Sequence, residues 1–374
     1  MGDAALRARA AVLRERIAMT RDRLALWRLQ LSELHRSIDD GDRLLEGMLS
    51  ESARVADAIG ERNAAAAAAP APSTDRGDAM RAHGEWTSDD ARVAVACEQR
   101  RRPSMDDRYA TARIDASTFA IVVCDGHGGA ATSHVVAARL LAIVAEEWRG
   151  GTGEEQRDGE AGDALCFSMT HAFVRMEHEL YAARATGGST ATVVVVTRDA
   201  VVTAHVGDTR AVLLERCGGG AAWTVRRDTL TRAHRGDDAD EAARVQRRGG
   251  VIRDGRVRDA AGTASLEVTR AFGDFRFKTS AISGALIVPD AVVSVRPDVR
   301  RWRRTRDASL LVVVATDGYW DAMPDVDGAL DAALRAATTG DGAPAAVARA
   351  LLAASAASGT DNATVLVAAS SSSS

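Results

Sequence analysis

Short apolar runs that end at an aspartate constrain the fold of this chain more than any other feature. Such runs predict strands, so each of these aspartates stands where a strand meets a turn. A sheet can then gather carboxylates that the sequence scatters. Because clustered carboxylates repel one another, the group needs cations, and all-oxygen ligands favour Mg²⁺ or Mn²⁺. The aspartates are Asp125 after residues 119–124, Asp208 between residues 201–206 and 211–214, Asp317 after residues 310–316, and Asp361 before residues 365–367.

Charge, hydropathy and cysteine content argue against a nucleic-acid-binding, membrane or exported protein. With 374 residues, the chain has room for one large domain plus an accessory segment, or for two domains. The formal net charge is −4 and charges of both signs are mixed, so we predict no nucleic-acid partner. No apolar stretch approaches the roughly 20 residues that span a bilayer, and the N-terminus lacks a signal-peptide core. We therefore expect no membrane partner and an intracellular location, cytoplasmic, nuclear or both, with reduced cysteines.

The N-terminal part has the pattern of a helical segment followed by a linker. Apolar residues recur in heptads, for example at Leu24, Leu31, Ile38 and Leu45, which predicts a helical hairpin or coiled coil over residues 1–62. Two interpretations stay open: the segment folds back on its own domain, or it mediates self-association or binds a docking partner. Residues 63–87, rich in Ala and Pro, are predicted to be a linker, and residues 370–374 a disordered Ser tail.

Residues 88–369 are predicted to form the main domain. Continuous apolar runs are typical of sheets covered on both faces, and a tight turn at 197–200 favours antiparallel pairing. We expect an α+β fold with two face-to-face antiparallel β-sheets flanked by helices, an α-β-β-α sandwich, preceded by the N-terminal helical segment. Strands are predicted at residues 93–96, 119–124, 191–197, 201–206, 211–214, 310–316 and 364–368, and helices at 133–148, 163–183, 240–248 and 343–357.

Two motifs indicate phosphate and metal chemistry. In the sequence DGHGG, Asp125 at a strand end can bridge two cations, and Gly126 lets its carbonyl approach a metal. His127 beside them suits a general acid. In the sequence RPSMDD, Arg102 suits a phosphate clamp and Asp106 a further metal ligand. Taken singly, each motif also fits an ordinary turn or a solvated loop.

Taken together, the motifs resemble those of a known family. The chain is similar to the type 2C metal-dependent Ser/Thr protein phosphatases, the PPM family, in a plant-like form, from about residue 93 to residue 367. The matching motifs occur in the family's order: RPSMDD at 102–107, DGHGG at 125–129, GSTA at 188–191, GDTR at 207–210, LTRAH at 230–234, GGV at 249–251, RAFGD at 270–274, DGYWD at 317–321 and DNAT at 361–364.

The resemblance implies a role for each matching residue. Asp125 would bridge two catalytic cations, Mg²⁺ or Mn²⁺, and a water between them would hydrolyse phosphoserine or phosphothreonine in proteins. His127 would be the acid and Arg102 would bind the phosphate. The remaining implied metal ligands are Asp106 and the Gly126 carbonyl for one cation, Asp317 and Asp361 for the other, and Asp208 with Asp317 for a third, weaker one.

One departure from the family pattern leaves alternatives open. The family usually has Glu where this chain has Asp106, so we expect a looser metal site there. A catalytically weak pseudophosphatase, acting as a binding module through residues 1–62, is the first alternative. A phosphohydrolase for small molecules with the same metal core is the second.

Overall fold

The computed structural model describes most of the main domain and none of the first 82 residues. The predicted helical segment 1–62 and the tail beyond Ser370 therefore lie outside the described residues. None of the helices in the described residues combines the length and the apolar content that a membrane span requires. The described ranges are residues 83–88, 92–115, 118–150, 161–217, 222–259, 261–279, 286–305 and 308–370.

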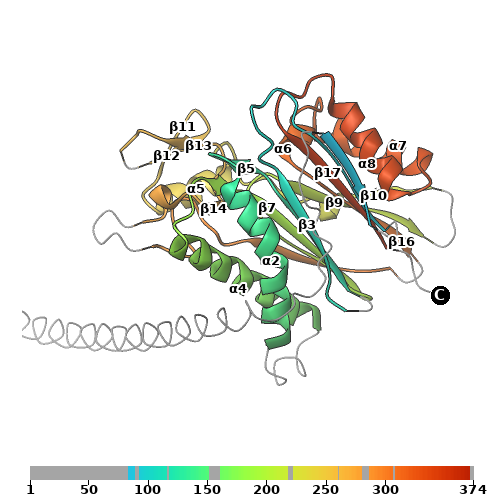
Figure 1. Cartoon of the computed structure of the whole chain (residues 1–374), viewed down its shortest axis with the longest axis horizontal. Coiled ribbons are helices and arrows are strands. Elements are labelled where there is room, and N and C mark those ends of the chain that lie inside the picture. Colours follow the sequence, from blue (N-terminus) through green and yellow to red (C-terminus); the bar gives the residue numbers. More distant parts are fainter. Residues whose placement is uncertain are drawn as a thin grey trace, which may run out of the picture. The chain divides into compact units, whose positions relative to one another are not determined.

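Two antiparallel sheets pack face to face in the centre of the domain (Figure 1). The first has six strands in the order β1 (His83–Thr87), β2 (Val93–Glu98), β17 (Ala363–Ser370), β16 (Ala308–Ala315), β9 (Arg210–Cys217) and β10 (Thr224–Arg226). The second has five in the order β15 (Asp298–Arg303), β8 (Ala200–Val206), β7 (Ala191–Val196), β4 (Phe119–Cys124) and β3 (Arg108–Arg113).

The apolar runs fill two layers at once because side chains alternate across a strand. In β4, Val122 and Cys124 join the core under the helices, whereas Ile121 and Val123 join the core between the sheets. The same alternation holds in β7 and β16. This double burial explains why the strands read as continuous hydrophobic sequence, and it confirms the predicted sandwich.

Helices cover the outer face of each sheet (Figure 1). The pair α2 (Ala131–Gly150) and α4 (Ala161–Ala182) packs on the second sheet. The first sheet is covered by α7 (Val326–Thr339) and α8 (Pro344–Ser355), preceded by the single turn α6 (Asp317–Trp320). The α-β-β-α order of layers is therefore the predicted one.

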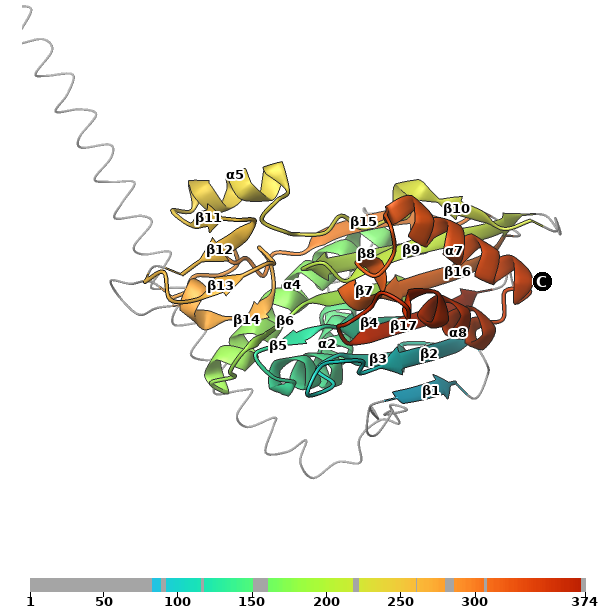
Figure 2. The ribbon, with the colours of Figure 1, turned by 90° about the horizontal axis from the view of Figure 1, so that it is seen from above.

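A small lobe lies beyond one end of the sandwich (Figure 2). It contains α5 (Ala239–Arg247) and a three-stranded sheet of β11 (Val251–Arg253), β12 (Arg256–Arg258) and β13 (Ser265–Leu266). Its own core includes Val245, Val257 and Phe277. A third short sheet, β14 (Phe272–Gly273), β6 (Gly188–Ser189) and β5 (Gly126–His127), joins this lobe to the strand ends that carry the aspartates.

Two predicted boundaries were wrong. The linker predicted to reach residue 87 ends earlier, because His83–Thr87 form β1 and pair with β2. The ring centroids of Trp86 and Tyr109 lie 6.1 Å apart. A single aromatic contact of this kind leaves no periodic pattern in the sequence from which the strand could be predicted. The tail was predicted to include residue 370, but Ser370 is the last residue of β17.

Candidate metal centre

Three carboxylates meet where strands of both sheets end. Asp125 follows β4, Asp208 lies in the turn between β8 and β9, and Asp317 opens α6 after β16. One ligand oxygen from each lies within 4.8 Å of the other two. The sheets thus bring together three of the four aspartates whose convergence the strand pattern predicted.

Two buried threonines fix the geometry between Asp125 and Asp208. The Thr190 amide donates to the Asp125 carbonyl at 2.9 Å, and the Asp125 amide donates to Thr190 Oγ1 at 3.1 Å. Thr190 Oγ1 lies 2.7 Å from Thr209 Oγ1, next to Asp208. The two turns are therefore held by a hydrogen-bonded chain that does not use the carboxylate oxygens of Asp125 and Asp208.

The electrostatics of this group favour a bound cation. Burial, and then the charges of neighbouring carboxylates, raise the pKa of Asp125 and of Asp317 well above the ordinary value. Asp317 Oδ1 is a buried oxygen for which the described residues supply no hydrogen-bond partner. An all-carboxylate donor set with an unsatisfied buried oxygen suits a hard divalent cation.

Asp361 and Asp106 approach the same end of the sandwich but lie outside the close group of three. Asn362, next to Asp361, accepts from the Asp106 amide through Oδ1 at 2.8 Å. Its Nδ2 donates to the carbonyls of Gln99 and Ser104 at 2.8 and 3.0 Å. Asn362 therefore ties together the two segments that carry these aspartates.

Glycine is required at two close approaches in the site. A Cβ on Gly318 would collide with the carbonyl oxygen of Asn362, so only glycine lets Asp317 approach Asp361 through their neighbours. A Cβ on Gly126 would lie 2.6 Å from both the Asp106 carbonyl oxygen and Ser133 Oγ. The structure therefore places Gly126 against Asp106, the residue with which it was predicted to share a metal.

Asp107 supports the site from beneath. It is fully buried, and Thr316 Oγ1–H donates to its Oδ2 at 3.0 Å. Burial raises the pKa of Asp107 to about 7 despite the hydrogen bonds it accepts. Thr316 precedes Asp317, so Asp107 holds the start of α6.

Two neighbouring arginines have different surroundings. Arg102 pairs with Asp361, but 57% of its side chain is exposed, so its guanidinium can still reach an anion at the rim of the site. Arg100 is buried and donates to the Gly318 carbonyl at 2.7 Å and to Ser355 Oγ at 2.6 Å. Arg102 is therefore available to a substrate, whereas Arg100 anchors the backbone behind Asp317.

His127 is held by Asp274. Its Nε2–H donates to Asp274 Oδ2 at 2.6 Å. Burial alone would lower the pKa of His127, but the bond and charge of Asp274 outweigh it, so the pKa is raised. Gly188 makes room for this pair, because a Cβ there would overlap both His127 Nε2 and Asp274 Oδ2.

Arg235, which neutralises part of the cluster, was not predicted from the sequence. Arg235 lies directly after the LTRAH motif and forms ion pairs with Asp208, Asp317 and Asp321. Its place next to a recognised motif was the only signal available. The contacts themselves depend on residues that lie 27 and 86 positions away from Arg235.

Known proteins resemble this chain in sequence and in fold. A model of the protein phosphatase 2C family matches residues 92–364. Probable protein phosphatase 2C 59 of Arabidopsis thaliana is 31% identical over 229 residues, covering 60% of this chain and 63% of that protein. Probable protein phosphatase 1N of Mus musculus is 31% identical over 243 residues, covering 63% of this chain and 54% of that protein. A plant and an animal protein are thus equally similar.

The solved structures agree in fold. The crystal structure of a serine-threonine phosphatase 2C from Toxoplasma gondii superposes with a TM-score of 0.56 at 20% identity, covering 74% of this chain and 94% of that one. The chain spans less than two thirds of the length of the two curated relatives described above. The family match nevertheless extends over most of the described residues and over all nine motifs, and it shows that the chain belongs to the protein phosphatase 2C family.

Proposed function

We propose that this chain hydrolyses phosphoserine and phosphothreonine in proteins with the help of two divalent cations, Mg²⁺ or Mn²⁺. The observation that carries the proposal is the group formed by Asp125, Asp208 and Asp317, whose ligand oxygens all lie within 4.8 Å of one another. Family membership supports the reaction class.

In this proposal the ligands keep the roles predicted from the sequence motifs. Asp125 would contact both cations, Asp317 and Asp361 would hold one, and Asp106 with the Gly126 carbonyl would hold the other. When bound, the cations would activate a water for attack and neutralise charge on the phosphate. The unsatisfied Asp317 Oδ1 and the raised pKa values of Asp125 and Asp317 support this assignment.

The chain's own residues would supply orientation and a proton. Arg102, exposed at the rim, would bind two phosphate oxygens with its planar guanidinium and release Asp361 as it does so. Asp274 accepts the Nε2–H of His127, so transfer of a proton to the leaving oxygen falls to Nδ1. Asp274 also favours the charged imidazolium from which that proton comes.

We also propose that the protein is intracellular. Residues 1–62 would bind a partner or a second copy of the chain. Cys97 and Cys124 are buried and unpaired, which suits a reducing compartment. The heptad pattern alone supports the role of residues 1–62.

The test is metal-dependent release of phosphate. The full chain should dephosphorylate a phosphothreonine peptide with Mn²⁺ or Mg²⁺ and lose activity in a chelator. The Asp125→Asn variant is expected to fold and be inactive. Faster turnover of a small phosphate ester than of any phosphoprotein would favour the small-molecule alternative. No metal-dependent turnover at all would favour the pseudophosphatase.

A further inference from the structure

Arg235 lies among three carboxylates at the edge of the metal centre. Its Nε donates to Asp208 Oδ2 at 2.7 Å, and its Nη2 donates to Asp321 Oδ2 at 2.6 Å. Nη2 also lies 3.5 Å from Asp317 Oδ2. Only 17% of the side chain is exposed, so the guanidinium spans this carboxylate triangle, Asp208, Asp317 and Asp321, as a nearly enclosed counter-charge.

The backbone that carries Arg235 is clamped on both sides. The His234 amide donates to the Gly207 carbonyl at 3.0 Å, next to Asp208. On the other side, the Thr269 amide donates to the His234 carbonyl at 2.9 Å, and a β-bridge joins Arg235 to Val268. These bonds direct the Arg235 side chain toward the carboxylate triangle before any ligand binds.

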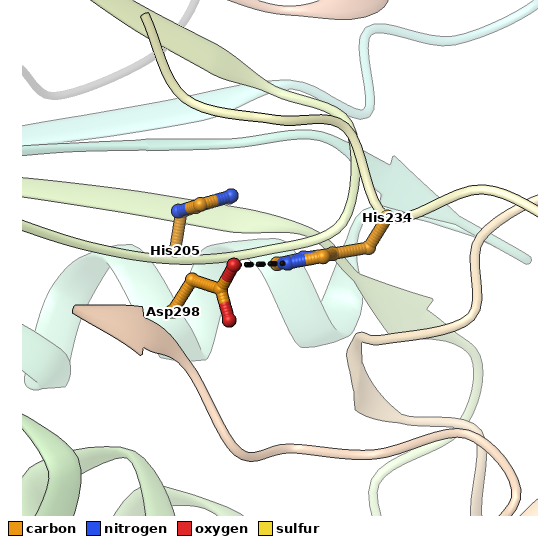
Figure 3. A group of neighbouring side chains, drawn as sticks. All are labelled: His205, His234 and Asp298. Carbon is orange, nitrogen blue, oxygen red and sulfur yellow. Dashed lines mark ion pairs between the residues drawn. The ribbon is translucent and has the colours of Figure 1, made fainter. Parts of the chain in front are cut away.

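Two buried histidines and the half-buried Asp298 beneath this segment reinforce the clamp (Figure 3). The rings of His205 and His234 stack with centroids 4.4 Å apart and planes 7° from parallel. His234 Nε2 lies 3.3 Å from Asp298 Oδ2, as the dashed line in Figure 3 marks. His205 Nε2–H donates to the Arg232 carbonyl at 2.8 Å, which ties β8 to the residues just before Arg235.

The hydrogen bonds of this cluster indicate anchoring rather than metal binding. The Gly207 amide donates to His234 Nδ1 at 3.2 Å, so Nδ1 holds a lone pair and the ring proton sits on Nε2, facing Asp298. A metal at Nε2 would require that proton to move to Nδ1, against the Gly207 N–H. His234 therefore fixes the backbone next to Arg235 and does not compete as a metal ligand.

We propose that Arg235 serves as a built-in cation of the carboxylate triangle, in place of a third divalent ion. The inference rests on the proposed two-cation function and revises the expected third site at Asp208 and Asp317. A third ion would have to displace the Arg235 guanidinium. That group makes two charge-assisted hydrogen bonds, to Asp208 and Asp321, and its backbone is held in place on both sides. The chain should therefore bind two divalent cations with useful affinity, and the third only weakly.

The test is a titration that counts the Mn²⁺ ions bound per chain. The electron paramagnetic resonance signal of free Mn²⁺ measures how much of the ion remains unbound. The full-length wild type should bind two ions, and Arg235→Gln should bind a third at least tenfold more tightly than the wild type does. Arg235→Gln combined with Asp321→Asn should lose much of this gain. Arg232→Gln removes the same charge from an exposed arginine paired with Asp238 and Asp240, so it should still bind two.

The outcomes separate the inference from the proposed function. A wild type that binds three ions with similar affinity, or an Arg235→Gln variant whose third-ion affinity stays within threefold of wild type, would overturn the inference alone. Binding of no Mn²⁺ by the wild type would overturn both. If Arg235→Gln does not fold, Arg235→Lys replaces it. Lysine keeps the charge but lacks the fork that bridges Asp208 and Asp321, so it too should bind the third ion more tightly than wild type.

Discussion

Lys278 Nζ lies 2.6 Å from Glu177 Oε1, and neither side chain has any exposed surface. Lys278 Nζ also donates to the Ala271 carbonyl at 2.5 Å, and the Gly273 amide donates to Glu177 Oε2 at 3.0 Å. Glu177 comes from α4, so the pair connects that helix to the loop that ends at Asp274. An ion pair far from the surface thus holds the residue that orients His127.

Removing one member of this pair should be costly. Lys278→Met leaves the Glu177 carboxylate buried without its counter-charge, so we expect a loss of about 3–5 kcal/mol in the free energy of unfolding. Glu177→Leu combined with Lys278→Met should recover much of that loss. Urea unfolding measures both. Arg349→Ala, which breaks an exposed pair with Glu85, serves as the control and should cost about 1 kcal/mol or less. Equal losses in Lys278→Met and Arg349→Ala would contradict this account.

The acid sensitivity of the fold should depend on Glu241 in α5. Burial alone would raise its pKa, but bonds and charge from Arg270, a bond from Thr269 and the charge of Arg244 lower it to about 2, from an ordinary 4.5. A depressed pKa stabilises the folded state above about pH 4.5, and this contribution disappears as the pH falls toward 2. After allowance for solvent screening we expect it to be about 2 kcal/mol.

The measurement compares wild type with Glu241→Gln at several pH values. The difference in their free energies of unfolding should be largest near pH 6 and should shrink as the pH falls below 4.5. A difference that stays constant from pH 6 to pH 3 would show that the Glu241 charge contributes nothing to stability.

Much of the fold could be predicted because buried strands carry their own signal. The strand predicted at 119–124 coincides with β4, and the strand predicted at 310–316 overlaps most of β16 (Ala308–Ala315), because both faces of each strand are apolar. The strands β3 and β15 and the helix α7 were missed. Arg108–Arg113 and Asp298–Arg303 carry charged residues because they form the two edges of their sheet, and that place becomes visible only in the assembled sheet.

The site divides in the same way. Asp125, Asp208 and Asp317 could be predicted to converge, because each ends a recognisable strand. Arg235 and the Glu177–Lys278 pair could not, because nothing local distinguishes them from other charged residues apart from the LTRAH motif that precedes Arg235. Their roles arise from partners that only the tertiary structure brings near.

Neutralising Asp317 should abolish activity and stabilise the metal-free protein. Its pKa is raised by burial and then by the charge of Asp208, so the ionised carboxylate costs stability near neutral pH. We expect Asp317→Asn to raise the metal-free Tm by about 2 °C or more while turnover falls to background. Asp327→Asn, at an exposed position in α7, is the control and should change neither. Near-normal turnover in Asp317→Asn would be inconsistent with the assigned metal ligand.

Deletion of residues 1–75 should leave the chemistry intact, because all the proposed site residues lie beyond residue 100. Turnover of a small phosphopeptide should stay within about twofold of the full chain. Oligomeric state, measured by light scattering, or turnover of a large phosphoprotein should change. A large fall in small-peptide turnover would instead make this segment part of the catalytic fold.

Lengthening Asp106 should tighten metal binding. Its amide is held by Asn362 Oδ1 at 2.8 Å, and its carbonyl accepts Ser133 Oγ–H at 2.6 Å, so the backbone cannot advance to offset a short side chain. Asp106→Glu supplies one more methylene. We expect the Mn²⁺ concentration for half-maximal rate to fall about threefold, or about 0.7 kcal/mol, with kcat little changed. Asp327→Glu controls for a general effect of longer carboxylates. A half-maximal concentration that is unchanged or higher in Asp106→Glu would mean that the aspartate already reaches its cation.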